Sequence, residues 1–301
     1  MSSHVSLGLQ HPRVLKTQLG KIPKVDWSSD GKYILSASED DALLVWDAHT
    51  YNKLALFQVP SLWIMTCAFS PSAETIAAGG LNNNCKVIST ERPDAEPVEL
   101  MGHTGFISSC KYIDENRLLT SSGDKTCIAW DIRRQTPITK FEGHSGDVMA
   151  LDFLPENPNL FISGGCDKTS KVWDLRTSSC CLTISDNKSD INSISFFPSK
   201  TAFATGVEDG STKCFDIRAK AAIFEYPSQL SNPVTSVRFS NSGKFLFAAT
   251  GNVCEVWDSA AATSVASLSG HENRVSSITL SPGGTALATG SWDSTIRLWF
   301  T

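Results

Sequence analysis

The chain has 301 residues, a formal net charge of −5, 41% apolar residues and 19% charged residues. This apolar fraction is enough for a sizeable core and excludes a disordered chain. The slight acidic excess argues against a nucleic-acid binder, which needs clustered Lys and Arg to contact phosphates. No apolar run reaches the roughly 20 residues of a membrane helix, and the N-terminus lacks a signal-peptide profile, so we expect a soluble, cytosolic protein.

The nine Cys residues are an odd number and include no C-x-x-C pair. Their spacing fits neither a zinc site nor a disulfide framework. We therefore expect reduced thiols that fill space inside strands, and we expect neither a metal site nor a cofactor site.

The first predicted element is a strand at residues 13–17, after a short leader of residues 1–12. From there a repeat of 42 or 43 residues runs to the end of the chain. Trp46, Trp130, Trp173 and Trp257 each begin a Trp-Asp pair in the same phase. Ile88, Phe215 and Trp299 occupy the three remaining slots.

Each repeat reads as short strands broken by turns, and no helical period is sustained over about 12 residues. Residues 118–122 and 127–130, for example, are short predicted strands on either side of a turn at 123–125. Four short strands in a unit marked by Gly-His and Trp-Asp pairs are typical of a WD-repeat blade. The sequence therefore predicts an all-β, seven-bladed WD-repeat β-propeller in a single domain at 13–301.

Closure of the ring can also be predicted. The seventh unit stops after Trp299 without an outer strand, whereas Leu15 stands three residues before Gln18, which occupies the phase of the His residues. The apolar residues at the same position in other units are Phe57, Leu100, Phe141, Ile184 and Leu268. We expect the strand at 13–17 to complete the seventh blade, so that the ring has no open edge.

Polar residues recur at fixed phases within the units. A Ser or Thr lies ten residues before the Trp, an Asp lies six before it, and a Gly-His pair lies further upstream. Buried together, the four side chains can satisfy one another from indole N–H to hydroxyl, imidazole and carboxylate. The complete sets are His103, Thr120, Asp124 and Trp130; His144, Ser163, Asp167 and Trp173; and His271, Thr289, Asp293 and Trp299.

A Ser-His-Asp hydrolase triad is the alternative interpretation of these sets. It is disfavoured because the set recurs in three units at one phase and because no G-x-S-x-G motif is present. We therefore expect structural tetrads and no catalytic residues. Units two and six have Asn82 and Gly251 in the Asp slot, so their networks should be incomplete.

The repeat phase also predicts a surface, because equivalent positions of a repeat fold lie on the same face. We call the recurring positions of the tetrad His and Asp in each unit the His phase and the Asp phase. Three and five residues after the His phase, and one residue before the Asp phase, the units carry aromatic, Met and acidic side chains. This mixture is typical of a protein-binding surface. The positions include Lys21, Pro23, Glu39, Trp63, Met65, Leu81, Phe106, Asp147, Met149, Cys166, Asp190, Asn192, Glu208, Arg274 and Trp292.

Three stretches carry a closer resemblance: GHTGFISSCKYIDENRLLTSSGDKTCIAWDI at 102–132, SDINSISFFPSKTAFATG at 189–206 and GHENRVSSITLSPGGTALATGSWDSTIRLW at 270–299. With the segments at 63–68 and 79–81, they resemble the β subunits of heterotrimeric G proteins, from about residue 13 to residue 299. The resemblance implies a non-enzymatic signal transducer. Its narrow face would bind a GDP-bound α subunit and, after release, effectors.

The family's α-contact positions coincide largely with the surface given by the repeat phase. They fall here on Lys21, Trp63, Met65, Leu81, Asn83, Phe106, Asp147, Met149, Asp190, Asn192, Glu208 and Trp292. The resemblance implies a second contact, with the N-terminal helix of the α subunit, on the flank of blade one. It would lie near Leu19, Leu44, Asn52 and Lys53.

Several positions depart from the family pattern. Pro23 replaces a Tyr, Phe106 replaces a Tyr, and Glu208 replaces an Asp. Family members also begin with a long amphipathic helix that coils with the γ subunit, whereas about a dozen residues, Pro12 among them, precede the first strand here. This departure puts γ binding in question. It fits a shortened or alternatively started form as well as a divergent member that works without γ.

A WD-repeat scaffold for unrelated partners, such as a ribosome-associated kinase anchor or a ubiquitin-ligase adaptor, is the alternative function. It accounts for the missing helix. It does not explain why the predicted surface coincides with the α-contact positions. Under either interpretation, attachment to the inner face of the plasma membrane would depend on lipidated partners.

Overall fold

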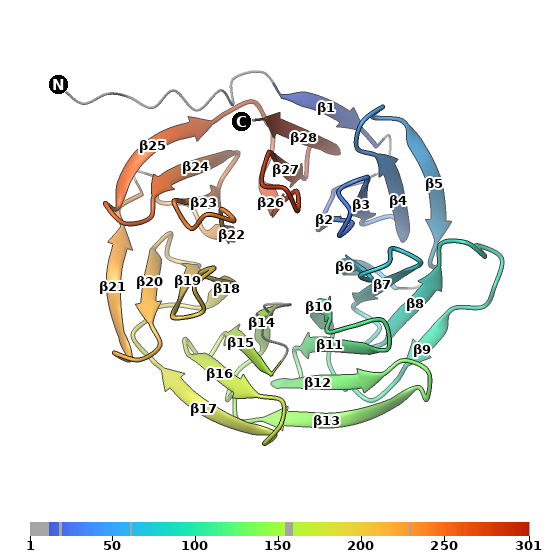
Figure 1. Cartoon of the computed structure of the whole chain (residues 1–301), viewed down its shortest axis with the longest axis horizontal. Coiled ribbons are helices and arrows are strands. Elements are labelled where there is room, and N and C mark those ends of the chain that lie inside the picture. The colour runs from blue at the N-terminus through green and yellow to red at the C-terminus, as the bar shows by residue number, and fades with distance from the viewer. Residues whose placement is uncertain (1–11, 18–19, 61, 154–158, 229, 301) are drawn as a thin grey trace.

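The computed structural model describes residues 12–17, 20–60, 62–153, 159–228 and 230–300. Within these residues the fold is all-β, with seven four-stranded antiparallel sheets arranged as blades around a central axis (Figure 1). This confirms the predicted seven-bladed β-propeller. The leader expected at 1–12 lies outside the described residues except for Pro12. No described segment is a helix long and apolar enough to cross a membrane.

Each blade runs from an innermost strand outward through three more strands. The innermost strands are β2 (Val25–Trp27), β6 (Ile64–Phe69), β10 (Ile107–Tyr112), β14 (Val148–Phe153), β18 (Ile191–Phe196), β22 (Val234–Phe239) and β26 (Val275–Leu280). The second strands are β3 (Tyr33–Ser38), β7 (Thr75–Gly80), β11 (Arg117–Ser122), β15 (Leu160–Gly165), β19 (Ala202–Val207), β23 (Phe245–Thr250) and β27 (Ala286–Ser291).

The third strands are β4 (Ala42–Asp47), β8 (Cys85–Ser89), β12 (Thr126–Asp131), β16 (Ser170–Asp174), β20 (Thr212–Asp216), β24 (Val253–Asp258) and β28 (Thr295–Phe300). The outer strands are β5 (Lys53–Gln58), β9 (Val98–Leu100), β13 (Thr136–Glu142), β17 (Ser179–Ile184), β21 (Ala221–Tyr226), β25 (Thr263–Leu268) and β1 (Arg13–Lys16).

The apolar residue near the end of each outer strand holds that strand against the blade. In β13 most side chains are exposed, but Phe141 is buried against Trp173 and Phe161 of the next blade. Its counterparts Phe57, Leu100, Ile184 and Leu268 are buried as well. Blade five uses Tyr226 at this position, and its hydroxyl donates to the Ser259 carbonyl of blade six. Each blade therefore covers part of its core with the next blade.

Polar side chains also link neighbouring blades near the axis. A hydroxyl or carboxylate of one innermost strand accepts a hydrogen bond from a backbone N–H of the next. The pairs include Thr66 with Cys110, Asp152 with Phe196, Ser193 with Val237 and Ser236 with Ile278. Ser277 accepts from Val25 and so joins blade seven to blade one. These bonds satisfy backbone donors that face another blade.

The first and last strands close the ring, as predicted. β1 pairs antiparallel with β28, with Leu15 opposite Ile296. Leu15 is buried in a cluster that includes Ile34 of blade one and Leu298 of blade seven. Figure 1 shows the blue N-terminal strand lying beside the red C-terminal blade. The edge of β28 is therefore paired, and blade seven is held by both ends of the chain.

Candidate partner-binding face

The antiparallel order of the strands places two sets of segments at one end of every blade. An innermost strand starts at this end, and the second strand returns to it before turning into the third. The loop that precedes the innermost strand and the turn between the second and third strands therefore share a face. We call this surface the candidate face.

Backbone hydrogen bonds join the two segments in six blades. The carbonyl of the residue three after the His phase accepts from the N–H of the residue just before the Asp phase. The donor and acceptor pairs are Glu39 and Lys21, Leu81 and Trp63, Gly123 and Phe106, Cys166 and Asp147, Glu208 and Asp190, and Trp292 and Arg274, at 2.8–3.3 Å. Two sets of positions that are far apart in the sequence are thereby brought side by side.

Three large apolar side chains stand out from the candidate face. Trp63 is 61% exposed, Leu81 is 47% exposed and Trp292 is 38% exposed. Trp63 has a positive φ of 46°, an uncommon conformation for a bulky residue. A Cβ at Gly80 would collide with the carbonyls of Leu62 and Trp63. The glycine thus permits the close backbone approach that places Trp63 beside Leu81.

Two cations lie close to the Trp292 ring. The Lys21 ammonium is 5.0 Å from the ring centroid, and the Arg274 guanidinium is 5.4 Å from it. Lys21 also pairs with Glu39 at 3.3 Å. Cation–π attraction of this kind orients the indole before any partner arrives. Arg274 is absent from the α-contact positions that the resemblance supplied, but the repeat phase had placed it on this face.

Phe106 and the acidic residues occupy the blades on the far side of the ring from Trp292. The Phe106 ring packs on Gly123, where no Cβ would fit, and is half-buried. Asn192 donates to the Glu208 carboxylate at 2.7 Å. Burial and the nearby Asp190 carboxylate raise the pKa of the Cys166 thiol to about 12. The charged groups on this side of the face include Asp147, Asp190 and Glu208.

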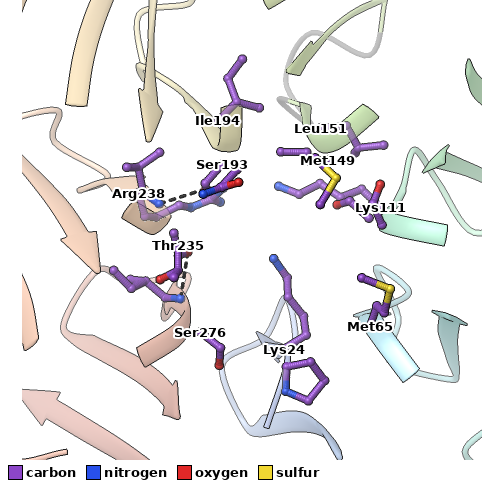
Figure 2. Close-up of a pocket in the computed structure, with 18 residues that line it drawn as sticks. Lys24, Met65, Lys111, Met149, Leu151, Ser193, Ile194, Thr235, Arg238 and Ser276 are labelled. Carbon is purple, nitrogen blue, oxygen red and sulfur yellow. Dashed lines mark hydrogen bonds between the residues drawn. The ribbon is translucent and has the colours of Figure 1, made fainter. Parts of the chain in front are cut away.

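The centre of the candidate face is the mouth of the axial channel. Met65, Met149 and Asn192 line a cavity there, and Figure 2 shows Met65 and Met149 at its edge. Asn83 lies in the β7–β8 turn beside Leu81, half-buried and with a φ of 68°. All twelve predicted partner-binding residues thus lie at the same end of their blades.

The predicted second contact on the flank of blade one needs a correction. Leu44 is 1% exposed and belongs to the cluster that contains Leu15 and Trp46. It lies on β4, which is covered by β3 and β5 in its own sheet and by blade seven on one side, so it cannot meet a partner. Asn52 and Lys53 are exposed, and Leu19 lies outside the described residues.

The recurring His, Ser or Thr, Asp and Trp residues form hydrogen-bonded chains inside three blades. Trp130 Nε1–H donates to Thr120 Oγ1 at 2.8 Å, Thr120 lies 2.8 Å from His103 Nε2, and His103 Nδ1 lies 2.8 Å from Asp124. The chains of blades four and seven run through Ser163 and Thr289 in the same order, with contacts of 2.7–3.0 Å. None of the three hydroxyls is placed to attack a substrate, because all three are fully buried.

A neutral imidazole satisfies every donor in such a chain. The indole N–H donates to the hydroxyl, the hydroxyl donates to Nε2, and Nδ1–H donates to the carboxylate. Burial lowers the pKa of His103, His144 and His271, although their Asp partners act in the opposite direction. Burial raises the pKa of Asp124, but bonds from Thr126, the Thr104 N–H and His103 outweigh it, so this pKa is lowered. The network therefore favours neutral His beside ionised Asp.

Blade five contains a substitute for the tetrad that the sequence analysis missed. Thr205 donates to Asn187 Oδ1 at 3.1 Å, and both side chains are buried. Phe215 replaces the Trp and has no N–H to satisfy. The signal was available, since Asn187 stands at the His phase, 43 residues after His144.

The cysteines are free thiols, and Cys67, Cys85, Cys110, Cys127, Cys214 and Cys254 are buried fillers as expected. Cys180 and Cys181 differ, because β17 is an outer strand and both side chains are exposed.

Comparison with known proteins agrees with the WD-repeat fold. A family model described as G protein beta WD-40 repeat protein matches residues 4–300. The guanine nucleotide-binding protein subunit beta of Schizosaccharomyces pombe is 63% identical over 297 residues, which cover 99% of this chain and 97% of the relative. The subunit beta of Dictyostelium discoideum is 47% identical over 292 residues, covering 95% and 84%. Subunit beta-1 of Homarus americanus is 46% identical over 292 residues, covering 95% and 86%. The chain therefore belongs to the G protein β family of WD-40 repeat proteins.

Proposed function

We propose that the chain is the β subunit of a heterotrimeric G protein and that its candidate face binds the α subunit in the GDP state. It performs no catalysis. After release from the α subunit, the same surface is available to effectors. The signal is transmitted by a change of the partner that occupies this surface.

The exposure of Trp63, Leu81 and Trp292 on one face carries this proposal. Trp is among the residues that dominate binding energy at protein interfaces, and such anchors work best when held in place before binding. Trp292 is held by Lys21 and Arg274. The acidic groups Asp147, Asp190 and Glu208 add charge that can select a partner with complementary basic groups.

Mutually exclusive occupancy supplies the switch. An α subunit that changes shape when it binds GTP loses affinity for a rigid surface fitted to its GDP state, and only this difference in affinity can shift the equilibrium. The β-propeller itself need not move, because its face is built on seven mutually packed blades. A lipidated partner would hold the complex at the inner face of the plasma membrane.

The test is capture of an α subunit by the immobilised full chain. We expect capture with GDP bound and little capture with a non-hydrolysable GTP analogue. Trp63→Ala and Trp292→Ala should each weaken binding by about 2 kcal/mol or more, as interface Trp residues do. Ile138→Ala is the matched control, because the exposure of Ile138, 52%, lies between those of Trp63 and Trp292, but Ile138 lies on outer strand β13.

Equal capture in both nucleotide states would contradict the nucleotide switch. Isolation of the tagged chain with complexes that contain no G-protein subunit would favour the scaffold alternative instead. Co-expression with a γ subunit, followed by size-exclusion chromatography, tests whether a γ chain is a further partner.

A further inference from the structure

Three cationic side chains converge on the axial channel just below the candidate face. Lys24 precedes β2, Lys111 lies on β10 and Arg238 lies on β22, so they come from blades one, three and six. They line one cavity of about 130 Å³, far above the roughly 10–15 Å³ that a single water needs. Figure 2 shows Lys24 and Lys111 reaching into it from different blades.

One buried carboxylate compensates two of these cations. Asp152 pairs with Lys111, and its Oδ1 lies 3.2 Å from Arg238 Nη1. Its other oxygen accepts from the Phe196 N–H at 2.7 Å. Both oxygens of Asp152 therefore have partners, and its one negative charge faces two positive charges.

Lys24 adds a third positive charge. Among the described residues, no carboxylate lies within ion-pair distance of its ammonium group. Asp26 is the other carboxylate nearby; it accepts from the Phe69 N–H, and burial raises its pKa against the opposite effects of that bond, Lys111 and Lys24. Burial, together with the charges of Arg238 and Lys24, lowers the pKa of the Lys111 amine, against the opposite effect of Asp152. The cations thus act on one another across the cavity.

Hydrogen-bond donors complete the wall. Ser193 and Ser236 each accept a backbone N–H, and a hydroxyl that accepts one bond still has its own proton to donate. Arg238 uses Nη1 for Asp152, which leaves other guanidinium N–H groups. Lys supplies a point charge and Arg a planar set of donors, the two side chains that proteins use most to bind phosphate.

We propose that the axial cavity binds a phosphate group, either free inorganic phosphate or the phosphate end of a small monoester. Lys24, Lys111 and Arg238 supply the charge, and the inner-strand hydroxyls supply further donors. The site lies at the centre of the candidate face and does not depend on which partner that face binds.

The test is isothermal titration calorimetry of the full chain with inorganic phosphate and, separately, glycerol 3-phosphate, each against KCl of equal ionic strength. We expect Lys24→Met to weaken binding about tenfold or more, the loss of one charged hydrogen bond. Asp152→Asn should strengthen binding, because it removes the competing carboxylate. Lys32→Met is the control, since Lys32 is exposed and pairs with Asp30 outside the channel.

Binding of either compound that depends on Lys24 supports the proposal, and the tighter compound identifies the source of the phosphate. No heat beyond that of KCl, or equal binding by wild type and Lys24→Met, would overturn it. A second measurement needs only the wild-type chain. Phosphate should protect Lys24 from amine acylation, read by peptide mass spectrometry, while Lys32 reacts unchanged. Equal acylation of Lys24 with and without phosphate would also overturn it.

Discussion

A single hydroxyl decides whether the polar core of a blade is satisfied. Thr120 accepts the Trp130 indole N–H and meets His103 Nε2, so it acts as acceptor and donor at once. In blade five Thr205 meets only Asn187, because Phe215 brings no N–H. The two blades therefore offer a matched comparison of the same residue type with two polar partners and with one.

We expect Thr120→Val to destabilise the protein more than Thr205→Val. Leaving a buried polar group unsatisfied costs about 1–3 kcal/mol. Thr120→Val leaves the Trp130 N–H and His103 Nε2 without this partner, whereas Thr205→Val leaves only Asn187 Oδ1 without it. Urea denaturation midpoints of the two variants and the wild type measure the difference. Ser199→Ala, at an exposed position, controls for loss of a hydroxyl as such, and equal midpoints for Thr120→Val and Thr205→Val would refute the explanation.

At the scale of elements, β1 has a larger effect than its four residues suggest. It pairs with β28 from Leu298 to Thr295, and without it the edge of the seventh blade would be open. The same strand carries Leu15 into the cluster shared by blades seven and one. It therefore contributes both backbone pairing and inter-blade packing.

Deletion of residues 1–17 should lower the melting temperature sharply. The deletion removes the β1–β28 ladder and the Leu15 side chain together. Differential scanning calorimetry of the shortened and full chains measures the change. An unchanged melting temperature would show that closure by β1 is dispensable.

Two substitutions within β1 serve as controls for this deletion. Leu15→Ala should cost about 2–5 kcal/mol, as large-to-small changes in cores do. Val14→Ala should stay within about 0.5 kcal/mol, because Val14 is exposed on the same strand. Similar losses for both would indicate that pairing rather than burial of Leu15 holds the strand.

At the scale of the whole molecule, the tetrads of three blades add up to a dependence of stability on pH. The folded state lowers the pKa of His103, His144 and His271, mainly by burial. As the pH falls below about 6.5, the unfolded chain takes up protons that the folded chain resists. Protonation at Nε2 would also remove the acceptor for the hydroxyl. The stabilisation is therefore present above about pH 6.5 and is lost as the pH falls.

We expect the free energy of unfolding to decrease between pH 7.5 and 5.5, by up to about 1.4 kcal/mol per pH unit for each His. His144→Asn, which copies the arrangement at Asn187, should remove about a third of this slope. His49→Asn should leave it unchanged, because His49 is exposed and outside the tetrads. Urea midpoints across this range provide the measurement, and a slope unaffected by His144→Asn would refute the assignment.

The sequence predicted the blades and the composition of the tetrads because both repeat at a fixed period. Trp130 and Thr120 are ten residues apart on paired strands, so their contact follows from local register. The expectation at Leu44 has a different origin, because it came from the family resemblance and from no pattern in the repeat. A resemblance can assign a contact to the flank of blade one without showing which side chains there a neighbouring blade covers, and Leu44 is buried in the cluster shared with blade seven.

What the sequence determined by itself was the number of blades, their polar networks, the strand that closes the ring and the phase of the candidate face. Each follows from a pattern that recurs or from neighbours within one blade. The tertiary structure alone decided which face residues stand exposed, how Lys21 and Arg274 hold Trp292, and that Lys24, Lys111 and Arg238 share one cavity. Those groups come from different blades, and Arg238 meets an Asp152 that lies 86 residues away. Residues so far apart in the sequence come into contact only when the blades close into a ring, and no pattern within a single repeat predicts these contacts.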